Sequence, residues 1–172
     1  MISQHIFLVG PMGVGKTTIG KRLASLMSRP FIDIDKEIEA RSGADIQWIF
    51  DREGEQGFRE RESRALEDIV LAKEAIIIAT GGGIVLRPSN RDILRTCGSC
   101  VYLCASKEQL YERTLRDKSR PLLQVENRQK VIADLLKQRD PLYREVADLI
   151  FPAEGGQVSK VAKRLLDALS EL

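Results

Sequence analysis

The sequence predicts an α/β fold, in which the strands of a parallel sheet alternate with helices along the chain. Short apolar or alternating runs recur at residues 6–9, 31–35, 75–79 and 100–104, and helix-like segments follow them. The first run passes directly into a glycine-rich loop that precedes a helix. A length of 172 residues with 43% hydrophobic content fits one domain, residues 1–172, with a substantial core.

The glycine-rich loop carries the spacing G-x-x-x-x-G-K-[ST], formed by Gly10, Gly15, Lys16 and Thr17. Glycine accepts positive φ and has no Cβ, so the loop's N–H groups can surround phosphate oxygens at the N-terminus of the next helix. Lys16 would add a positive charge, and Thr17 a hydroxyl ligand for Mg²⁺. The loop therefore predicts a nucleoside triphosphate site rather than a plain glycine turn.

Charge and hydropathy argue against several other classes of protein. The chain has 27 Lys and Arg against 25 Asp and Glu. Its formal charge of +2 does not indicate binding to nucleic acid or to an anionic membrane. No stretch approaches the ~20 apolar residues of a membrane span, and no signal peptide precedes the first strand. We expect a cytoplasmic monomer without nucleic-acid or membrane partners.

Three cysteines cluster at Cys97, Cys100 and Cys104. A structural zinc site would need four ligands, and the sole histidine, His5, belongs to another strand. Cys100 and Cys104 fall on an apolar strand, where thiols act as small core residues. We therefore expect structural cysteines.

Residues 31–35 alternate in polarity, so a strand would place Asp33 and Asp35 on one face. Both carboxylates would then lie at the strand's carboxyl end, where open α/β sheets bind ligands. In a plainer interpretation Asp35 only caps a helix at 36–42, which leaves Asp33 unexplained. We favour a functional pair.

A charged helix is expected from about residue 56 to residue 72, after a short helix at 46–50. Its Arg59, Arg61 and Glu62 fit a solvated face with charge pairs, which is the usual role of such a run. Periodicity alone does not single out Arg59.

The apolar run at 75–79 predicts a central parallel strand, which leads through Thr80 into Gly81, Gly82 and Gly83. Three consecutive glycines carry an entropic cost, which is explained if the backbone approaches a ligand closely. Substrate contact is therefore favoured over a plain turn.

The remaining segments continue the alternation of helix and strand. Helices are expected at about 89–97 and 106–115, through Val131, Leu135 and Leu136, and from Val158, with strands at 100–104 and 149–151. The polar, basic loop at 116–125 is long enough to fold over bound phosphates as a lid, with Arg120 at its tip.

These motifs together resemble those of the shikimate kinases, P-loop small-molecule kinases related to nucleoside monophosphate kinases. The matching pieces are Gly10 to Thr17, Asp33-x-Asp35, Gly54-Glu55-x-x-Phe58-Arg59-x-x-Glu62, Thr80 to Gly83, Arg120-Pro121-Leu122 and Arg139-x-Pro141-Leu142-Tyr143. They cover nearly the whole chain, and their combination is specific although most are weak alone. The resemblance implies a three-layer P-loop fold, with a five-stranded parallel sheet of order 2-3-1-4-5 and helices on both faces. It also implies a substrate-binding insertion at about 36–62 and a lid at about 113–125.

The resemblance further implies ATP-dependent phosphorylation of the shikimate 3-hydroxyl, which yields shikimate 3-phosphate and ADP in aromatic amino-acid (chorismate) biosynthesis. The implied cofactors are ATP and Mg²⁺, and the implied catalytic residues are Lys16, Asp35 and Arg120. The implied ATP contacts are Gly13, Val14, Gly15, Lys16, Thr17, Thr18, Arg113 and Arg120, with Arg113 stacked on adenine. The implied shikimate contacts are Asp35, Arg59, Gly81, Gly82, Gly83 and Arg139, and Mg²⁺ would be held by Thr17 and, through water, by Asp33.

Physical chemistry agrees with these assignments. Shikimate carries one carboxylate, which the guanidinium forks of Arg59 and Arg139 can hold in a fixed geometry. Lys16 and Arg120 would neutralise the charge that spreads over the transferred phosphoryl oxygens. The sequence leaves open whether Asp35 is a base or only positions the hydroxyl, and which residues near 153–157 contact adenine.

Two other functions remain. A related kinase acting on gluconate or a nucleoside monophosphate would share the P-loop and the lid, but it would not need Asp35, Arg59 and Arg139 together. A non-catalytic nucleotide-binding regulator is the more distant alternative, since the chain lacks the guanine-reading motif N-K-x-D.

Overall fold

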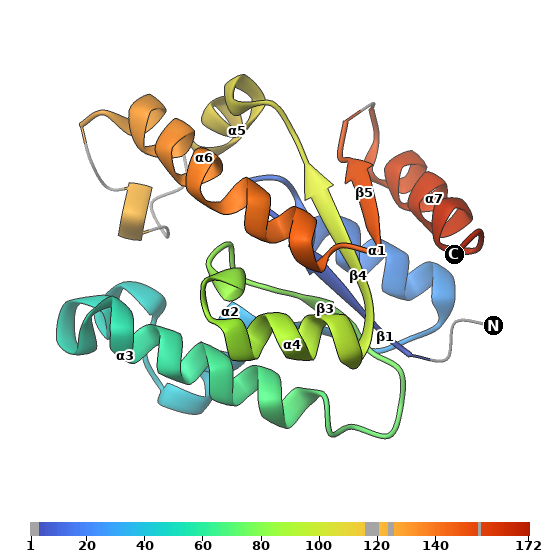
Figure 1. Cartoon of the computed structure of the whole chain (residues 1–172), viewed down its shortest axis with the longest axis horizontal. Helices are drawn as coiled ribbons and strands as arrows, with labels where there is room; N and C mark the ends of the chain where they lie inside the picture. Colours follow the sequence, from blue (N-terminus) through green and yellow to red (C-terminus); the bar gives the residue numbers. More distant parts are fainter. Residues whose placement is uncertain (1–3, 116–120, 124–125, 155) are drawn as a thin grey trace.

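The computed structural model describes residues 4–115, 121–123, 126–154 and 156–172 (Figure 1). Five strands form one sheet of order β2-β3-β1-β4-β5, and all neighbouring strands are parallel. The strands are β1 (His5–Val9), β2 (Phe31–Asp33), β3 (Ile77–Ala79), β4 (Gly98–Cys104) and β5 (Leu149–Pro152). The predicted fold class and strand order are confirmed.

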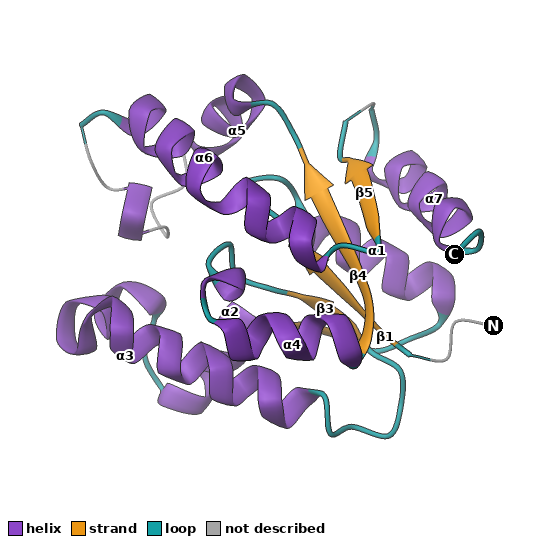
Figure 2. Ribbon diagram, in the orientation of Figure 1, coloured by secondary structure: helices purple, strands orange, loops and turns teal. Residues whose placement is uncertain are grey.

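Helices cover both faces of this sheet (Figure 2). They are α1 (Lys16–Met27), α2 (Ile34–Ser42), α3 (Ile46–Ile69), α4 (Pro88–Thr96), α5 (Lys107–Thr114), α6 (Arg128–Val146) and α7 (Val158–Leu169). Two short 3-10 turns follow β3 and α5, at η1 (Ile84–Leu86) and η2 (Pro121–Leu123). Within the described ranges, none of these helices combines the length and apolar character needed to cross a bilayer.

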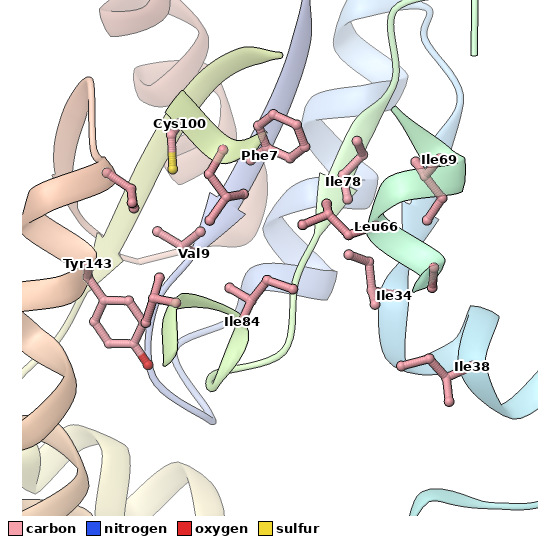
Figure 3. Close-up of a cluster of buried hydrophobic side chains, with 14 of the residues drawn as sticks. Phe7, Val9, Ile34, Ile38, Leu66, Ile69, Ile78, Ile84, Cys100 and Tyr143 are labelled. Atoms are coloured by element: carbon pink, nitrogen blue, oxygen red, sulfur yellow. The ribbon is translucent and has the colours of Figure 1, made fainter. Parts of the chain in front are cut away.

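The core has two apolar layers, one on each face of the sheet. Because side chains alternate along a strand, β1 contributes Phe7 and Val9 to one layer and Ile6 and Leu8 to the other. The first layer joins the sheet to α2, α3, α4 and α6 (Figure 3), and the second joins it mainly to α1 and α7. Cys100 is fully buried in the first layer, as expected for a structural cysteine.

The second strand is shorter than predicted. It ends at Asp33 and α2 begins at Ile34, so strand alternation does not pair Asp33 with Asp35. Asp33 is instead the N-cap of α2, and its Oδ1 accepts a hydrogen bond from the N–H of Lys36 (3.3 Å). The interpretation of Asp35 as the cap is also wrong, because Asp35 lies in the first helical turn. A carboxylate there interacts favourably with the helix dipole.

Two helices also differ from expectation. The predicted helices at 46–50 and 56–72 belong to the one element α3, which bends at Gly54 (φ 73°, ψ 178°). α6 continues past its predicted apolar face through Pro141 to Val146, so Arg139 is a helical residue.

Candidate active site

The glycine-rich loop at residues 10–17, which we call the P-loop, connects β1 to α1. It lies at the point where the strand order changes direction, with β3 on one side of β1 and β4 on the other. Gly10, Gly13 and Gly15 have φ angles of 145°, 82° and 105°, the positive values expected for this loop. Lys16 is 9% exposed, and its ammonium donates hydrogen bonds to the carbonyls of Gly10 (2.6 Å) and Pro11 (2.9 Å). The lysine charge is thus fixed beside the N–H groups that begin α1.

A cavity of about 210 Å³ opens at this loop, and we call it the phosphate pocket. Its lining joins P-loop residues to both aspartates: Gly13, Gly15, Lys16, Thr17, Thr18, Asp33, Asp35 and Thr80. Val14 is buried behind the loop in the apolar core. The phosphate pocket therefore gathers most of the residues predicted to bind the triphosphate.

The two residues predicted for Mg²⁺ meet directly. Thr17 Oγ1 donates a hydrogen bond to Asp33 Oδ2 at 2.6 Å. The described residues contain no group of three or more His, Cys, Asp or Glu that could hold a metal ion. This donor set fits Mg²⁺, which keeps several waters and takes one or two protein oxygens together with substrate phosphates.

A larger cavity of about 460 Å³, which we call the acceptor pocket, lies beside the phosphate pocket. It is bounded by α2, α3, α6 and η2, and its lining includes Met12, Asp45, Phe50, Phe58, Arg59, Gly81, Gly82, Gly83, Pro121, Leu122 and Arg139. Thr17, Asp33 and Asp35 line both cavities. A group bound in one pocket can therefore reach the other past the aspartates. Among these lining residues, the sequence pattern had not singled out Met12 or Phe50.

Two buried arginines line the acceptor pocket. Arg59 (7% exposed) donates to Glu62 Oε1 (3.0 Å) and Glu55 Oε1 (3.3 Å). Arg139 is only 3% exposed, and no described residue forms an ion pair with it or accepts a hydrogen bond from its Nε. Burying a guanidinium without a carboxylate partner is costly, so this position favours an anionic ligand.

The interpretation of α3 as a solvated charged face is wrong for Arg59 and Glu62, which are buried. It holds for Arg61, which pairs with Glu53 at the surface (2.7 Å). The distinction depends on which side of α3 meets the core, and charge spacing does not reveal that.

The glycine loop, Gly81–Gly83, passes between these charged side chains. A Cβ on Gly83 would lie 2.3 Å from the Arg59 guanidinium, and one on Gly81 would lie 2.7 Å from Glu62 Oε2 and 3.1 Å from Asp35 Oδ1. A Cβ on Gly82 would lie 3.3 Å from Arg139 Nη1. Each glycine thus lets a charged group approach the backbone closely. The sequence predicted that a ligand approaches this backbone closely. The protein's own charged side chains already need the same space.

Sequence patterns did not assign a role to Glu62, which belongs to this cluster. The signal that could have identified it is its position in the same motif as Arg59. It is completely buried, and its Oε2 has no hydrogen-bond partner among the described residues. Burial raises the pKa of Glu62 from 4.5 to about 7, while the charge of Arg59 opposes the rise and that of Asp35 adds to it. The Glu62 carboxyl therefore titrates near neutral pH.

This titration predicts a pH-dependent stability. Between pH 4.5 and about 7 the native state keeps a Glu62 proton that the unfolded chain releases, so Glu62 makes stability fall as the pH rises through this window. Thermal unfolding from pH 4.5 to 8 should show wild type losing stability relative to Glu62→Gln up to about pH 7, and no further change above it. Glu60→Gln, at an exposed position of α3, is the matched control for removing one carboxylate from this helix. A wild-type-minus-Glu62→Gln difference that is constant with pH would contradict the assignment.

Of the remaining predicted nucleotide contacts, Arg113 lies at the edge of the site. Arg113 is exposed at the end of α5, and its guanidinium donates to the carbonyls of Val14 (2.9 Å) and Ala153 (3.4 Å). It therefore links the P-loop to the segment expected near adenine. Arg120 lies outside the described residues.

Comparisons with known proteins agree with this geometry. A model of the shikimate kinase family matches residues 12–170. A shikimate kinase of Acinetobacter baylyi is 52% identical over 162 residues, which span 94% of this chain and 89% of the relative. The solved structure of shikimate kinase from Acinetobacter baumannii in complex with shikimate superposes with a TM-score of 0.95 at 47% identity, covering 98% of this chain and 94% of that one.

A more distant structure bears on the alternative acceptor. A gluconokinase from Sinorhizobium meliloti 1021 superposes with a TM-score of 0.60 at 16% identity, covering 99% of this chain and 95% of that one. Identity this low indicates a shared fold and nothing about the acceptor.

Proposed function

This chain belongs to the shikimate kinase family, and we infer that it transfers the γ-phosphoryl group of ATP to the 3-hydroxyl of shikimate. The observation that carries the inference is the junction of the two pockets at Asp35, with the buried guanidinium of Arg139, which has no carboxylate partner among the described residues, lining the acceptor side. A small hydroxylated carboxylate would match both features. The binding of shikimate by the similar Acinetobacter baumannii protein supports the same acceptor.

We propose that Arg59 and Arg139 bind the shikimate carboxylate. Both are buried, so their charge-assisted hydrogen bonds to a carboxylate would be weakly screened by solvent. Glu62 Oε1 accepts a hydrogen bond from Nη1 of the Arg59 guanidinium (3.0 Å), which restricts the orientation of that group. The glycine loop supplies the wall along the ring of the acceptor.

At the other end, Asp35 faces the position where the acceptor hydroxyl would meet the triphosphate. We propose that it orients this hydroxyl and accepts its proton during transfer. Lys16 would stabilise the charge on the transferred oxygens, and the sequence assigns a similar role to Arg120. Thr17 and, through water, Asp33 would hold Mg²⁺, which supplies charge neutralisation at the phosphates.

We further propose that residues 1–172 act as one domain, in which residues 36–62 cover the acceptor and residues 113–125 form the lid. A cytoplasmic monomer without nucleic-acid or membrane partners stays our expectation, on the charge and hydropathy of the chain.

An ADP-release assay with three competing acceptors tests the function. Shikimate should be phosphorylated with a kcat/KM at least about 10³-fold above those for gluconate and AMP, because shikimate fixes its carboxylate and hydroxyls on one ring, whereas gluconate is a flexible chain and AMP has no carboxylate. Preference for gluconate or AMP, or nucleotide binding without phosphoryl transfer to any acceptor, would contradict the proposal.

Arg139→Ala should raise the KM for shikimate at least about 30-fold, with a smaller change in kcat, because the carboxylate contact exists in ground and transition states alike. The KM for ATP should stay within about twofold. Arg144→Ala, an exposed neighbour on α6, is the matched control. With an acceptor whose carboxylate is replaced by a neutral amide, wild type and Arg139→Ala should become equal. If the variant still binds the amide far worse, Arg139 contacts another group.

A further inference from the structure

Tyr143 of α6 reaches from the core to the glycine loop. Its side chain is 1% exposed, in the same apolar layer as Val9 and Ile84 (Figure 3). The Tyr143 hydroxyl donates a hydrogen bond to the carbonyl of Gly82 at 2.5 Å. Among the described residues, no other side chain forms a hydrogen bond with the backbone of the glycine loop. We propose that Tyr143 is a positioning residue for shikimate; this inference rests on the proposed function.

The peptide that joins Gly82 to Gly83 transmits this contact to the acceptor pocket. It is trans, as are all peptides of the described chain, so its carbonyl and its N–H point in opposite directions. With the carbonyl held by Tyr143, the Gly83 N–H has a set direction, and no described residue accepts a hydrogen bond from it. Gly83 lines the acceptor pocket. Tyr143 therefore orients a backbone donor that can bind an oxygen of the acceptor.

The position of Tyr143 is itself firmly held. Its ring packs on Tyr102 with 5.0 Å between the ring centroids, and the Tyr102 hydroxyl donates to Asp140 Oδ1 (2.7 Å). Burial raises the pKa of Tyr143 to about 12, and the nearby charge of Arg139 opposes this rise. The hydroxyl thus remains a donor throughout the working range of pH. A phenylalanine would fill the same space in the core but leave the Gly82 carbonyl without its partner.

Tyr143→Phe and Tyr102→Phe form a matched pair. Both tyrosines are 1% exposed in one core layer, and each substitution removes a hydroxyl, but of the two only the Tyr143 hydroxyl bonds the glycine loop and interacts with Arg139. We expect Tyr143→Phe to raise the shikimate KM, and the dissociation constant measured calorimetrically without nucleotide, by about 10-fold. The KM for ATP should change less than twofold. Tyr102→Phe should lose similar thermal stability and leave the shikimate KM within about twofold.

A measurement on wild type removes the dependence on any variant. In a ¹⁵N-resolved NMR titration with shikimate, the Gly83 amide resonance should shift and saturate with the calorimetric dissociation constant. Equal effects of the two substitutions on shikimate, no effect of Tyr143→Phe, or a Gly83 amide that does not respond would each overturn the inference while wild type still phosphorylates shikimate. A wild type that does not phosphorylate shikimate would remove the proposed function, and the inference with it.

Discussion

Replacement of Lys16 by methionine should lower kcat at least about 10³-fold, the scale on which charged donors act in phosphoryl transfer. Methionine keeps the length and apolar body of the side chain but cannot neutralise the oxygens of the transferred group. It also removes the hydrogen bonds to the carbonyls of Gly10 and Pro11. We therefore expect a stability loss of roughly 1–3 kcal/mol with the fold retained.

Circular dichroism, thermal unfolding and steady-state kinetics at saturating shikimate separate these effects. Lys163→Met, at an exposed position of α7, should match wild type in all three. If Lys16→Met folds and keeps its kcat within a few-fold of wild type, the P-loop assignment is wrong.

Asp35→Asn should lower kcat by at least about 10²-fold, in the range reported for loss of a general base. The amide preserves the size of the side chain and can still hydrogen-bond the acceptor hydroxyl, but it cannot accept its proton. Because Asp35 lines both pockets, we expect a change there to act on the groups that react under the proposed function. Glu37→Gln is the control, since it neutralises another carboxylate in the same helical turn, outside both pockets.

The pH profile of kcat distinguishes a base from a group that only positions the hydroxyl. If Asp35 is the base, kcat should fall at low pH as Asp35 becomes protonated, and this acid limb should be present in wild type and in Glu37→Gln. It should be absent from the residual activity of Asp35→Asn. A variant that keeps the acid limb and mainly raises the KM for shikimate would indicate positioning alone.

Sequence patterns predicted the P-loop and the alternation of strands and helices with little error, and the resemblance to a family supplied the sheet order. Such patterns are local: the spacing from Gly10 to Thr17 and the continuous apolar runs are set by residues close together in the chain. Resemblance to a family added Arg59 and Arg139, which periodicity could not select. The boundaries of β2 and α3 were harder to predict. At the end of β2, Asp33 suits a strand end and an N-cap equally.

The meeting of distant residues was decided by the tertiary structure alone. Asp35 and Arg139 come to one cavity from α2 and α6, and Glu62 becomes buried because of the side that α3 turns to the core. The contact from Tyr143 to Gly82 joins residues 61 positions apart. Burial and pKa depend on which elements pack together, and the hydrophobic pattern of a single helix or strand specifies its inward face but not the charged groups it will meet there.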